Sequence, residues 1–306
     1  MKKMGQNTEC RKIKLCIEQG SGQAYQYIIS DWIDVVFLDL KTYQFRQNIN
    51  RNQDILEINY CLSGRAECKM KDGCLQYIGE GDLFLNRSGN HSDEIGFPFG
   101  CYTGIIIRMN LKQWDEKLFE TFFKEQIQKQ EFVDKFFTED ECFFIQAKEE
   151  TLHLFSAMTS IPVKDRGVYF TIKLFELFLY LRYIDPQKEK QTKAYTREQA
   201  DIVKQIEKRM TGELSQRFTI EEMAREYGIS TTTLKAQFKD IYGKSISEYM
   251  KDCRIREAQM LLIQTNQSIS EIALSVGYGS QSKFGAVFKE RMHITPLEFR
   301  KKKREP

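Results

Sequence analysis

The sequence contains few histidines: only His91, His153 and His293 occur among its 306 residues. Metal-dependent enzymes built on small β-barrels hold their ion with several imidazoles and a carboxylate, and only His91 lies among the strand-rich first 110 residues. One imidazole cannot supply such a ligand set. We therefore expect no metal site, no cofactor and no enzymatic activity.

Closely spaced cysteine pairs are also lacking. The eight cysteines are Cys10, Cys16, Cys61, Cys68, Cys74, Cys101, Cys142 and Cys253, and no two of them form a Cys-x-x-Cys pair. A zinc-held cysteine cluster of the kind found in Ada-type DNA repair proteins needs such pairs and is therefore disfavoured. Most of the cysteines lie in apolar runs, as free buried thiols do, which indicates a reducing compartment.

Long hydrophobic runs are absent as well. No apolar stretch follows the charged residues at the N-terminus, so we expect no signal peptide. The most apolar segment, residues 164–184, is interrupted by Lys173, Glu176 and Arg182 and is a poor membrane span. The sequence thus predicts a cytoplasmic protein with no membrane partner.

The formal net charge is only +3, but positive charge gathers at the C-terminal end. Residues 277–306 contain eight lysines and arginines against three acidic residues, and the basic run 300–304 lies within them. A basic end of this kind suits contact with DNA phosphates. A solvated lysine tail is the alternative reading.

An internal repeat organises the last third of the chain: residues 219–249 recur as residues 268–299. The matched pairs are Ile220 with Ile269, Ala224 with Ala273, Gly228 with Gly277, Leu234 with Phe284, Phe238 with Phe288, Ser245 with Thr295, and Tyr249 with Phe299. Such a repeat usually means that one supersecondary unit is used twice.

Each copy of the repeat predicts a helix-turn-helix. In the first copy, Thr219 and Glu222 form a capping box at the start of a short helix. Gly228 stands where that helix ends, a position that favours positive φ. Ser230 caps the next helix, whose first turn is small and polar and can enter the major groove of DNA without a clash. The second copy has the same features.

A long helix is expected between the two copies. Ser245 and Glu248 predict a third capping box, and the helix that follows extends to about Ile263. Its 19 residues span roughly 28 Å at about 1.5 Å each. Successive major-groove faces lie about 34 Å apart, so this spacer suits two recognition helices on one DNA face. Thr295 with Glu298 predicts a fourth box, at the start of a closing helix.

These features together resemble the DNA-binding domain of the AraC/XylS family of transcriptional regulators, over about a third of the chain. The matching residues are Ala224, Gly228, Ser230, Leu234, Phe238, Lys239, Gly243, Ser245, Tyr249 and Arg254, then Ile272, Ala273, Gly277, Tyr278, Ser280, Ser282, Phe284, Phe288, Lys289, Thr295, Pro296, Phe299 and Arg300. Two positions depart from the family pattern. His293 replaces a usual glycine, which costs about 1 kcal/mol if its φ is positive, and Cys253 replaces a common tyrosine.

The resemblance implies a bacterial, nucleoid-associated regulator that binds double-stranded promoter or operator DNA and acts with RNA polymerase, commonly as an activator. The residues expected to read bases are Thr231, Thr232, Lys235, Gln281, Ser282 and Lys283. Those expected to hold phosphates are Ser230, Lys239, Arg254, Ser280 and Lys289.

The first 110 residues show strand and turn patterns. Apolar or alternating runs occupy Ile13–Ile17, Ile33–Leu38, Ile55–Tyr60, Leu83–Leu85 and Gly104–Arg108, with turn residues such as Ser63–Gly64 between them. Short strands at this spacing predict a jelly-roll or barrel. Residues 59–86 resemble the cupin-like sensor domain of many AraC-type proteins. We expect a small effector in the lumen, at residues that the sequence does not identify; a packed lumen without a ligand is the alternative.

Helical patterns follow. Residues 111–158 carry phenylalanines at helical spacing, including Phe143 and Phe144. The segment 164–184 places Phe170, Leu174, Leu177, Phe178, Leu181 and Ile184 on one face. We expect this face to pair two copies of the chain; packing on the chain's own barrel is the alternative. Residues 185–195 are interpreted as a charged linker.

The sequence thus predicts an α+β protein of two domains. A cupin-like β-barrel with helices from about residue 111 occupies residues 1–160, a dimerisation helix and linker occupy 161–195, and an all-α DNA-binding domain occupies 196–306. The predicted function is a DNA-binding transcriptional regulator controlled by a small effector and acting as a homodimer. A ligand-independent architectural or partner-recruiting DNA binder is the alternative.

Overall fold

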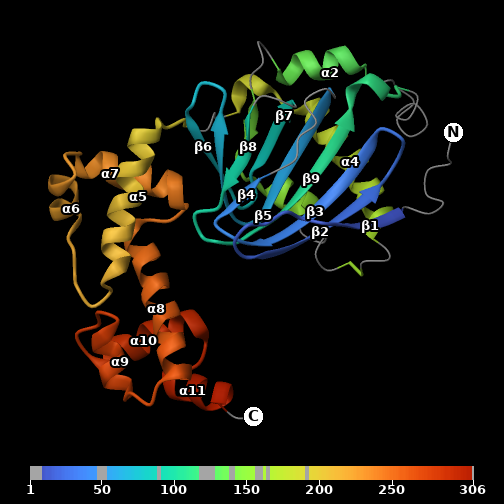
Figure 1. The fold of residues 1–306 in the computed structure, drawn as a ribbon. Helices are drawn as coiled ribbons and strands as arrows, with labels where there is room; N and C mark the ends of the chain where they lie inside the picture. The colour runs from blue at the N-terminus through green and yellow to red at the C-terminus, as the bar shows by residue number, and fades with distance from the viewer. Residues whose placement is uncertain are drawn as a thin grey trace. The chain divides into compact units, whose positions relative to one another are not determined.

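The structure, a computed structural model, describes residues 9–46, 54–87, 91–116, 128–137, 142–155, 161–162, 166–189 and 193–304. The chain divides into two compact units, residues 1–196 and residues 197–306. Strands dominate the first unit and the second is helical (Figure 1).

The first unit is built on antiparallel strands. Within its described residues these are β1 (Glu9–Ile13), β2 (Ser21–Ile28), β3 (Ile33–Lys41), β4 (Gln44–Arg46), β5 (Ile55–Met70), β6 (Leu75–Gly79), β7 (Leu83–Arg87), β8 (His91–Gly96), β9 (Tyr102–Asn110) and β10 (Phe143–Ile145). The main layer has the order β1-β2-β3-β9-β5-β7-β10. The second half of β5 pairs instead with β6 and β8, and β8 pairs with β4. The two layers therefore share one strand.

The predicted turn at Ser63–Gly64 is wrong, because β5 runs unbroken through it. The strand register against β9 shifts between Cys61 and Ser63, which marks a β-bulge. Gly64 has a φ of +88°, and a Cβ there would lie 2.5 Å from the carbonyl oxygen of Cys101. Only glycine fits both conditions. The bulge lets one long strand bend from the main layer into the second layer.

Four of the five predicted strand runs lie inside β3, β5, β7 and β9. The run Ile13–Ile17 is wrong, since β1 ends at Ile13. Phe143 and Phe144 were expected in a helix and instead form β10, which pairs with β7. Their rings point to the two opposite faces of the sheet, Phe143 into one core and Phe144 into the other. Two buried neighbours on opposite faces require a strand.

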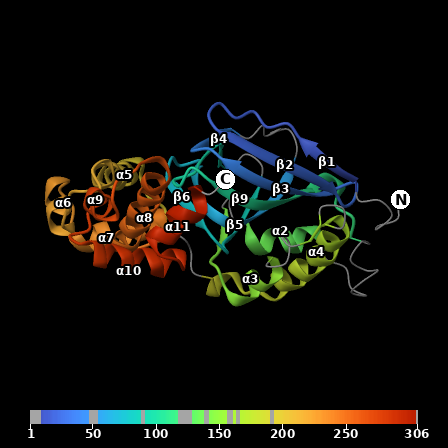
Figure 2. The same ribbon diagram turned by 90° about the horizontal axis from the view of Figure 1, so that it is seen from below.

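Helices cover one face of the main layer (Figure 2). They are the 3₁₀ turn η1 (Leu111–Gln113), α2 (Lys129–Phe136), α3 (Glu149–Phe155) and α4 (Arg166–Tyr183), followed by η3 (Pro186–Lys188). The other face packs against the second layer around a separate core that includes Leu38, Ile78 and Phe84. The predicted helical residues Phe119, Phe122 and Phe123 lie outside the described residues.

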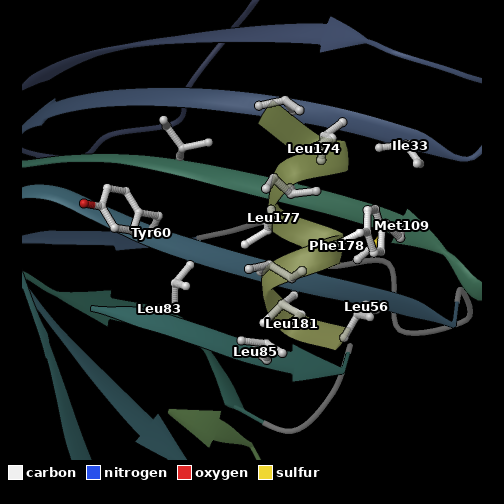
Figure 3. Close-up of a cluster of buried hydrophobic side chains, with 14 of the residues drawn as sticks. Ile33, Leu56, Tyr60, Leu83, Leu85, Met109, Leu174, Leu177, Phe178 and Leu181 are labelled. Atoms are coloured by element: carbon white, nitrogen blue, oxygen red, sulfur yellow. The ribbon is translucent and has the colours of Figure 1, made fainter. Parts of the chain in front are cut away.

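The apolar stripe of α4 packs on the chain's own sheet, so its expected use as the contact between two copies is wrong. Leu177 and Leu181 are at most 1% exposed, and Figure 3 shows them against strand residues that include Leu56 and Leu85. The stripe fits the sheet because that face of the strands is itself apolar and must be covered. Within the described residues, no helix is both long and apolar enough to cross a membrane.

The second unit consists of helices. They are α5 (Arg197–Gly212), α6 (Ile220–Glu226), α7 (Thr231–Tyr242), α8 (Ile246–Gln264), α9 (Ile269–Ser275), α10 (Gln281–Met292) and α11 (Pro296–Arg304). Leu234 and Phe238 of the first repeat and Phe284 and Phe288 of the second are fully buried. These residues give α7 and α10 their inward faces.

Truncation of α4 tests the packing described above. Leu177→Ala should lower the free energy of unfolding by about 2–5 kcal/mol, because it leaves a cavity beneath the helix. Ile172→Ala, on the exposed side of the same helix, should change it by no more than about 0.5 kcal/mol. Urea unfolding of both variants at low protein concentration makes the measurement. Equal losses would contradict the observed packing of the stripe.

Candidate nucleic-acid interface

Reciprocal capping boxes start the first helix of each helix-turn-helix, as predicted. The backbone N–H of Glu222 donates to the Thr219 hydroxyl oxygen at 3.1 Å, and the N–H of Thr219 donates to the Glu222 carboxylate at 2.8 Å. Ser268 and Glu271 repeat the pair at 3.2 and 2.7 Å. These bonds satisfy N–H groups that the start of a helix leaves unpaired.

The other two predicted boxes differ from each other. Thr295 and Glu298 form the full reciprocal pair at the start of α11, at 2.7 and 3.3 Å. At the start of α8 only one of the two hydrogen bonds of the predicted capping box is present. Ser245 accepts the N–H of Glu248 at 3.3 Å, but the Glu248 carboxylate bonds to Lys251 and Arg291 instead. Those cations lower the pKa of Glu248.

The turn glycines both have positive φ, +68° at Gly228 and +83° at Gly277, as predicted. Their surroundings differ. A Cβ on Gly228 would meet open space, whereas one on Gly277 would lie 2.2 Å from the carbonyl oxygen of Leu214. The second turn therefore needs glycine for its backbone conformation and for a close approach to the loop between α5 and α6.

His293 ends α10 in the left-handed conformation, with a φ of +59°. Gly243 ends α7 in the same way, with a φ of +71°. In both, the backbone N–H donates to the carbonyl four residues earlier, that of Lys289 or Lys239. The condition stated for a cost at His293 is thus met, because its side chain occupies a backbone conformation that favours glycine.

The residues predicted to read bases lie at the leading ends of α7 and α10. Thr232 and Lys235 are exposed and Thr231 is half-buried in the first helix. The second helix begins with Gln281, Ser282 and Lys283, which are all exposed. Each helix thus presents short polar or flexible cationic side chains at its N-terminal end, which can reach base edges in a major groove.

The predicted phosphate ligands fall into three kinds of position. Ser230 and Ser280 are exposed N-caps whose oxygens accept backbone N–H groups at 3.0 and 3.3 Å. Lys239 and Lys289 are exposed in the last turns of the recognition helices. Arg254 is half-buried instead. Its guanidinium lies beside the second turn, so that a Cβ added at Gly277 would be only 3.2 Å from it. Burial lowers the pKa of Arg254.

A brace between the two helix-turn-helix elements was not anticipated from the sequence. Arg217, in the loop before α6, donates from Nε and from Nη2 to the Gly277 carbonyl oxygen, each at 3.3 Å. Lys244, just before α8, pairs with Asp252 at 2.6 Å. Arg291 of α10 reaches Asp252 at 3.7 Å. No local pattern predicts these contacts, since Arg217 and Gly277 are 60 residues apart and Arg217 lies outside the repeat.

Together the contacts tie both recognition helices to α8, which links them (Figure 1). The Tyr249 hydroxyl of α8 also donates to Glu207 of α5 at 2.8 Å. The geometry therefore presents two exposed polar helix ends from one rigid helical support. A pair of helix ends held in this way can engage two successive segments of major groove.

The first unit holds a separate candidate site, a partly open cavity of about 250 Å³ between its two strand layers. Strands from both layers line it, with buried side chains that include Val36, Ile78 and Ile106. Within the described residues, no group of three histidine, cysteine, aspartate or glutamate side chains is placed to hold a metal ion.

The second unit defines a class, that of DNA-binding proteins with two helix-turn-helix elements joined by one helix. A family model described as a helix-turn-helix domain matches residues 223–302. The chain is 34% identical over 100 residues to the probable transcription factor PqrA of Proteus vulgaris, of which it covers 80%. The protein belongs to the AraC family of helix-turn-helix transcriptional regulators.

Other relatives are matched over a smaller share of their length. The transcriptional activator RhaR of Enterobacter sp. strain 638 is 28% identical over 108 residues, which are 35% of this chain and 38% of RhaR. Among solved structures, the C-terminal domain of AraT, a response regulator from Geobacillus stearothermophilus, is 30% identical. The match covers 33% of this chain and 84% of that domain, with a TM-score of 0.32.

The two helix ends with positive φ allow a reciprocal test. His293→Gly should raise the free energy of unfolding by about 1 kcal/mol, because it removes the steric cost of the left-handed conformation. Gly243→His, the matched change in the first repeat, should lower it by a similar amount. Chemical denaturation of the full chain gives both values. Loss of stability in His293→Gly would show that the imidazole contributes more than the backbone strain costs.

The capping boxes predict a specific acid sensitivity. Bonds from the Thr219 backbone N–H and side chain lower the pKa of Glu222. A lowered folded-state pKa means that this stabilisation is complete above the unfolded-state pKa, about 4.3, and is lost as the pH falls through the folded-state value. In Glu222→Gln the free energy of unfolding should therefore decrease less between about pH 5 and pH 3 than it does in the unmodified chain.

Glu221→Gln is the matched control, because Glu221 is an exposed carboxylate one residue away in the same helical turn. Thermal melting across this pH range compares the two variants with the unmodified chain. If both variants give the same pH dependence, the capping carboxylate is not the source of the effect.

Proposed function

We propose that the protein is a sequence-specific transcriptional regulator that binds promoter or operator DNA with α7 and α10 in successive major-groove segments. The observation that carries the proposal is the pair of exposed polar helix ends fixed to α8 and braced by Arg217. Membership of the AraC family supports DNA binding. We further propose that the regulator acts as an activator, through contact with RNA polymerase.

Individual roles follow from side-chain chemistry. Lys235 and Lys283 can donate to guanine and Gln281 can pair with adenine, with the neighbouring Thr231, Thr232 and Ser282 completing the base-reading ends. Lys239 and Lys289, together with the N-cap hydroxyls of Ser230 and Ser280, would hold phosphates. For Arg254 the position beneath the second turn favours a supporting role over the phosphate contact that the family resemblance implies.

We propose that the first unit is a cupin-like sensor domain that binds a small effector in its cavity. Its two antiparallel layers and the mostly apolar cavity between them support this assignment, since small-molecule sites are concave and mostly apolar. An effector can regulate the protein only by the difference in its affinity for the DNA-competent and DNA-incompetent states.

We propose that two copies of the chain pair through α4. The contact would use the outer face of the helix, because the buried stripe is occupied by the chain's own sheet. Val168, Ile172 and Tyr183 are 54%, 60% and 80% exposed, and the half-buried Phe175 and Leu179 lie between them. Steps of four, three, four and four residues place all five along one side of the helix. Apolar spacing of this kind suits pairing with an identical helix.

Ile172→Glu should therefore convert a dimer into a monomer in sedimentation velocity experiments, because it places a charge in the apolar seam. Leu152→Glu introduces the same charge at another exposed leucine, on α3, and should leave the sedimentation coefficient unchanged. A dimer that persists in Ile172→Glu would contradict the outer-face assignment.

Two lysine substitutions in α10 test the DNA contacts. Lys283→Ala should relax specificity at one base pair, with a loss of about 1–3 kcal/mol of discrimination. Lys289→Ala should weaken binding to all sequences alike and reduce the salt slope by about 1. Genome-wide footprinting supplies the DNA sites, and binding titrations at several salt concentrations supply the slopes. Identical behaviour of both variants would contradict the assignment of separate roles.

The footprinting also separates this function from its rival. A few sharp sites near promoters, each with two short elements about one helical turn apart, are expected. Diffuse coverage that follows base composition alone would instead support an architectural DNA binder.

A further inference from the structure

The cavity in the first unit has an apolar interior. Its lining includes Ala24, Leu38 and Phe84, which are at most 6% exposed. Asn59 is the one side-chain amide in the lining. A sugar or another polyol would leave most of its hydroxyl groups without partners there, and each unpaired buried hydroxyl is costly. The cavity therefore favours a ligand with a hydrocarbon body.

The charged residues that line the cavity all have the same sign. They are Lys14, Arg46 and Arg108, and no carboxylate is among the lining residues. Arg108 already pairs with Asp34, from Nε at 2.8 Å. Lys14 and Arg46 are exposed, and neither has an ion-pair partner in the part of the chain that the structure describes.

The position of Arg46 marks the open end of the cavity, and Lys14 belongs to the cavity lining alone. Arg46 and Cys16 line both the cavity and an adjoining outer hollow, and the acidic residues Glu18, Asp93 and Glu94 line only the outer hollow. A negative group at the end of a short ligand would thus meet Lys14 and Arg46 without reaching the acidic residues. A longer anion would extend toward them and be disfavoured by like-charge repulsion.

The volume limits the size of the ligand. An apolar cavity of about 150 Å³ holds benzene, with its six carbon atoms. At the same density, the cavity of about 250 Å³ accommodates roughly ten non-hydrogen atoms.

We propose that the effector is a small hydrophobic carboxylate of roughly ten to twelve non-hydrogen atoms, with its apolar body in the cavity and its anionic end at Lys14 and Arg46. This rests on the proposed sensor function of the first unit. A neutral hydrophobic ligand and a hydrophobic amine of equal size should both bind more weakly than the acid.

Calorimetric titration of the full chain with matched ligands tests the class. The acids are 3-phenylpropionate and octanoate, and the controls are 3-phenylpropanamide, octanamide and 3-phenylpropylamine. We expect at least one acid to bind with one-to-one stoichiometry and at least ten times more tightly than its amide and than the amine. Binding of an amide equal to that of its acid would overturn the charge assignment, and failure of both acids to bind would overturn the ligand class.

Variants locate the binding. The double change Lys14→Gln with Arg46→Gln should weaken binding of the acid at least tenfold, and Ala66→Leu, which fills the lumen, should abolish it. Lys41→Gln with Lys69→Gln removes two exposed lysines outside the lining and should leave the affinity unchanged. Equal loss in both double variants would overturn the assigned site. DNA binding by the same samples is measured separately, so failure of the regulator function is distinguishable from failure of the ligand class.

A second observation concerns residues 185–195, which were expected to form a free charged linker. Tyr195 forms a one-residue antiparallel bridge with Leu75 of β6. The Leu75 N–H donates to the Tyr195 carbonyl at 2.7 Å, and the Tyr195 N–H donates to the Leu75 carbonyl at 2.9 Å. The Tyr195 side chain is 6% exposed and its ring lies 6.4 Å from that of Tyr77. The end of the linker thus adds to the edge of the second layer.

The start of the linker is held near the same place. Glu189 is 9% exposed and pairs with Lys148 at 2.5 Å. The N–H of the adjacent Ala147 donates to Asp82 at 2.9 Å, and Asp82 lies in the turn that follows β6. Tyr195 is therefore bonded to β6 itself, and Glu189 is linked through Lys148 and its neighbour Ala147 to the turn that follows β6.

The strand β6 also lines the cavity, through Ile78. Leu75 and Ile78 are three residues apart on a strand of five residues, so a shift of Ile78 by a ligand bears directly on the bridge. We infer that the bridge of Tyr195 to Leu75 is a latch on β6, and that cavity occupancy changes DNA binding by holding or releasing it.

A disulfide can lock this latch. Directly paired residues that exchange two backbone hydrogen bonds have Cα atoms about 5.5 Å apart, which suits a disulfide. The double variant Leu75→Cys with Tyr195→Cys should bind a footprinted promoter fragment with an affinity at least threefold different under oxidising and reducing conditions. The single variant Leu75→Cys controls for the native cysteines. Equal affinities of the locked and reduced forms would overturn the latch.

Proteolysis tests the latch without reference to DNA. Tyr195→Pro removes the N–H that donates to Leu75 and should increase cleavage within residues 189–196 at least tenfold in the full chain. Lys193→Pro is the control, because residue 193 takes no part in the bridge. If Tyr195→Pro cleaves no faster than the control, the bridge does not hold the linker and the inference fails even where DNA binding is intact.

Discussion

The main sheet of the first unit is apolar on both faces, and this one constraint determines what surrounds it. Alternate residues of β5 point in opposite directions, so Leu56 and Ile58 face the helices while Cys61 faces the second layer. Both faces must be kept from water. One is covered by α2, α3 and α4. The other is covered by the strands that β5 itself reaches after the bulge at Gly64. The cavity lies between these two layers because their side chains do not fill the space completely. It therefore depends on the same bulge that brings β5 into the second layer.

In the second unit the corresponding constraint is the close approach at Gly277. Its missing side chain lets the backbone of Leu214 pass, and Arg217 then reaches the Gly277 carbonyl. Two helix-turn-helix elements that share only α8 could otherwise change their relative orientation. The contact holds the two copies of the sequence repeat so that their exposed helix ends have one fixed spacing. It also explains why the two turn glycines are not equivalent: Gly228 serves its own turn alone, whereas Gly277 serves the turn and the junction.

Local patterns predicted the second unit well and the first unit less well. Capping residues such as Thr219 and Glu222, and glycine positions such as Gly228, act within one helical turn, so the sequence alone reveals them. The bulge at Gly64, the strand at Phe143 and the brace at Arg217 depend on residues far away along the chain. A glycine in an apolar run is equally compatible with a turn and with a β-bulge. The candidate base readers could be located because the family pattern aligns them, whereas the cavity lining comes from strands scattered over nearly a hundred residues.

The helix α4 illustrates why one apolar stripe does not identify its partner. Its sequence predicted a continuous face, and the face exists, but periodicity reports only that something apolar covers it. The sheet beneath it is apolar over a matching length, and an intramolecular partner is present at a far higher effective concentration than a second copy. The stripe therefore packs in the chain's own core rather than against a second copy. What remains for association is the outer face, where exposed Val168 and Ile172 lie without cover among the described residues. Under the proposed pairing, one stripe of α4 contributes to the core of the first unit and the opposite side of the same helix contributes to the contact between two copies.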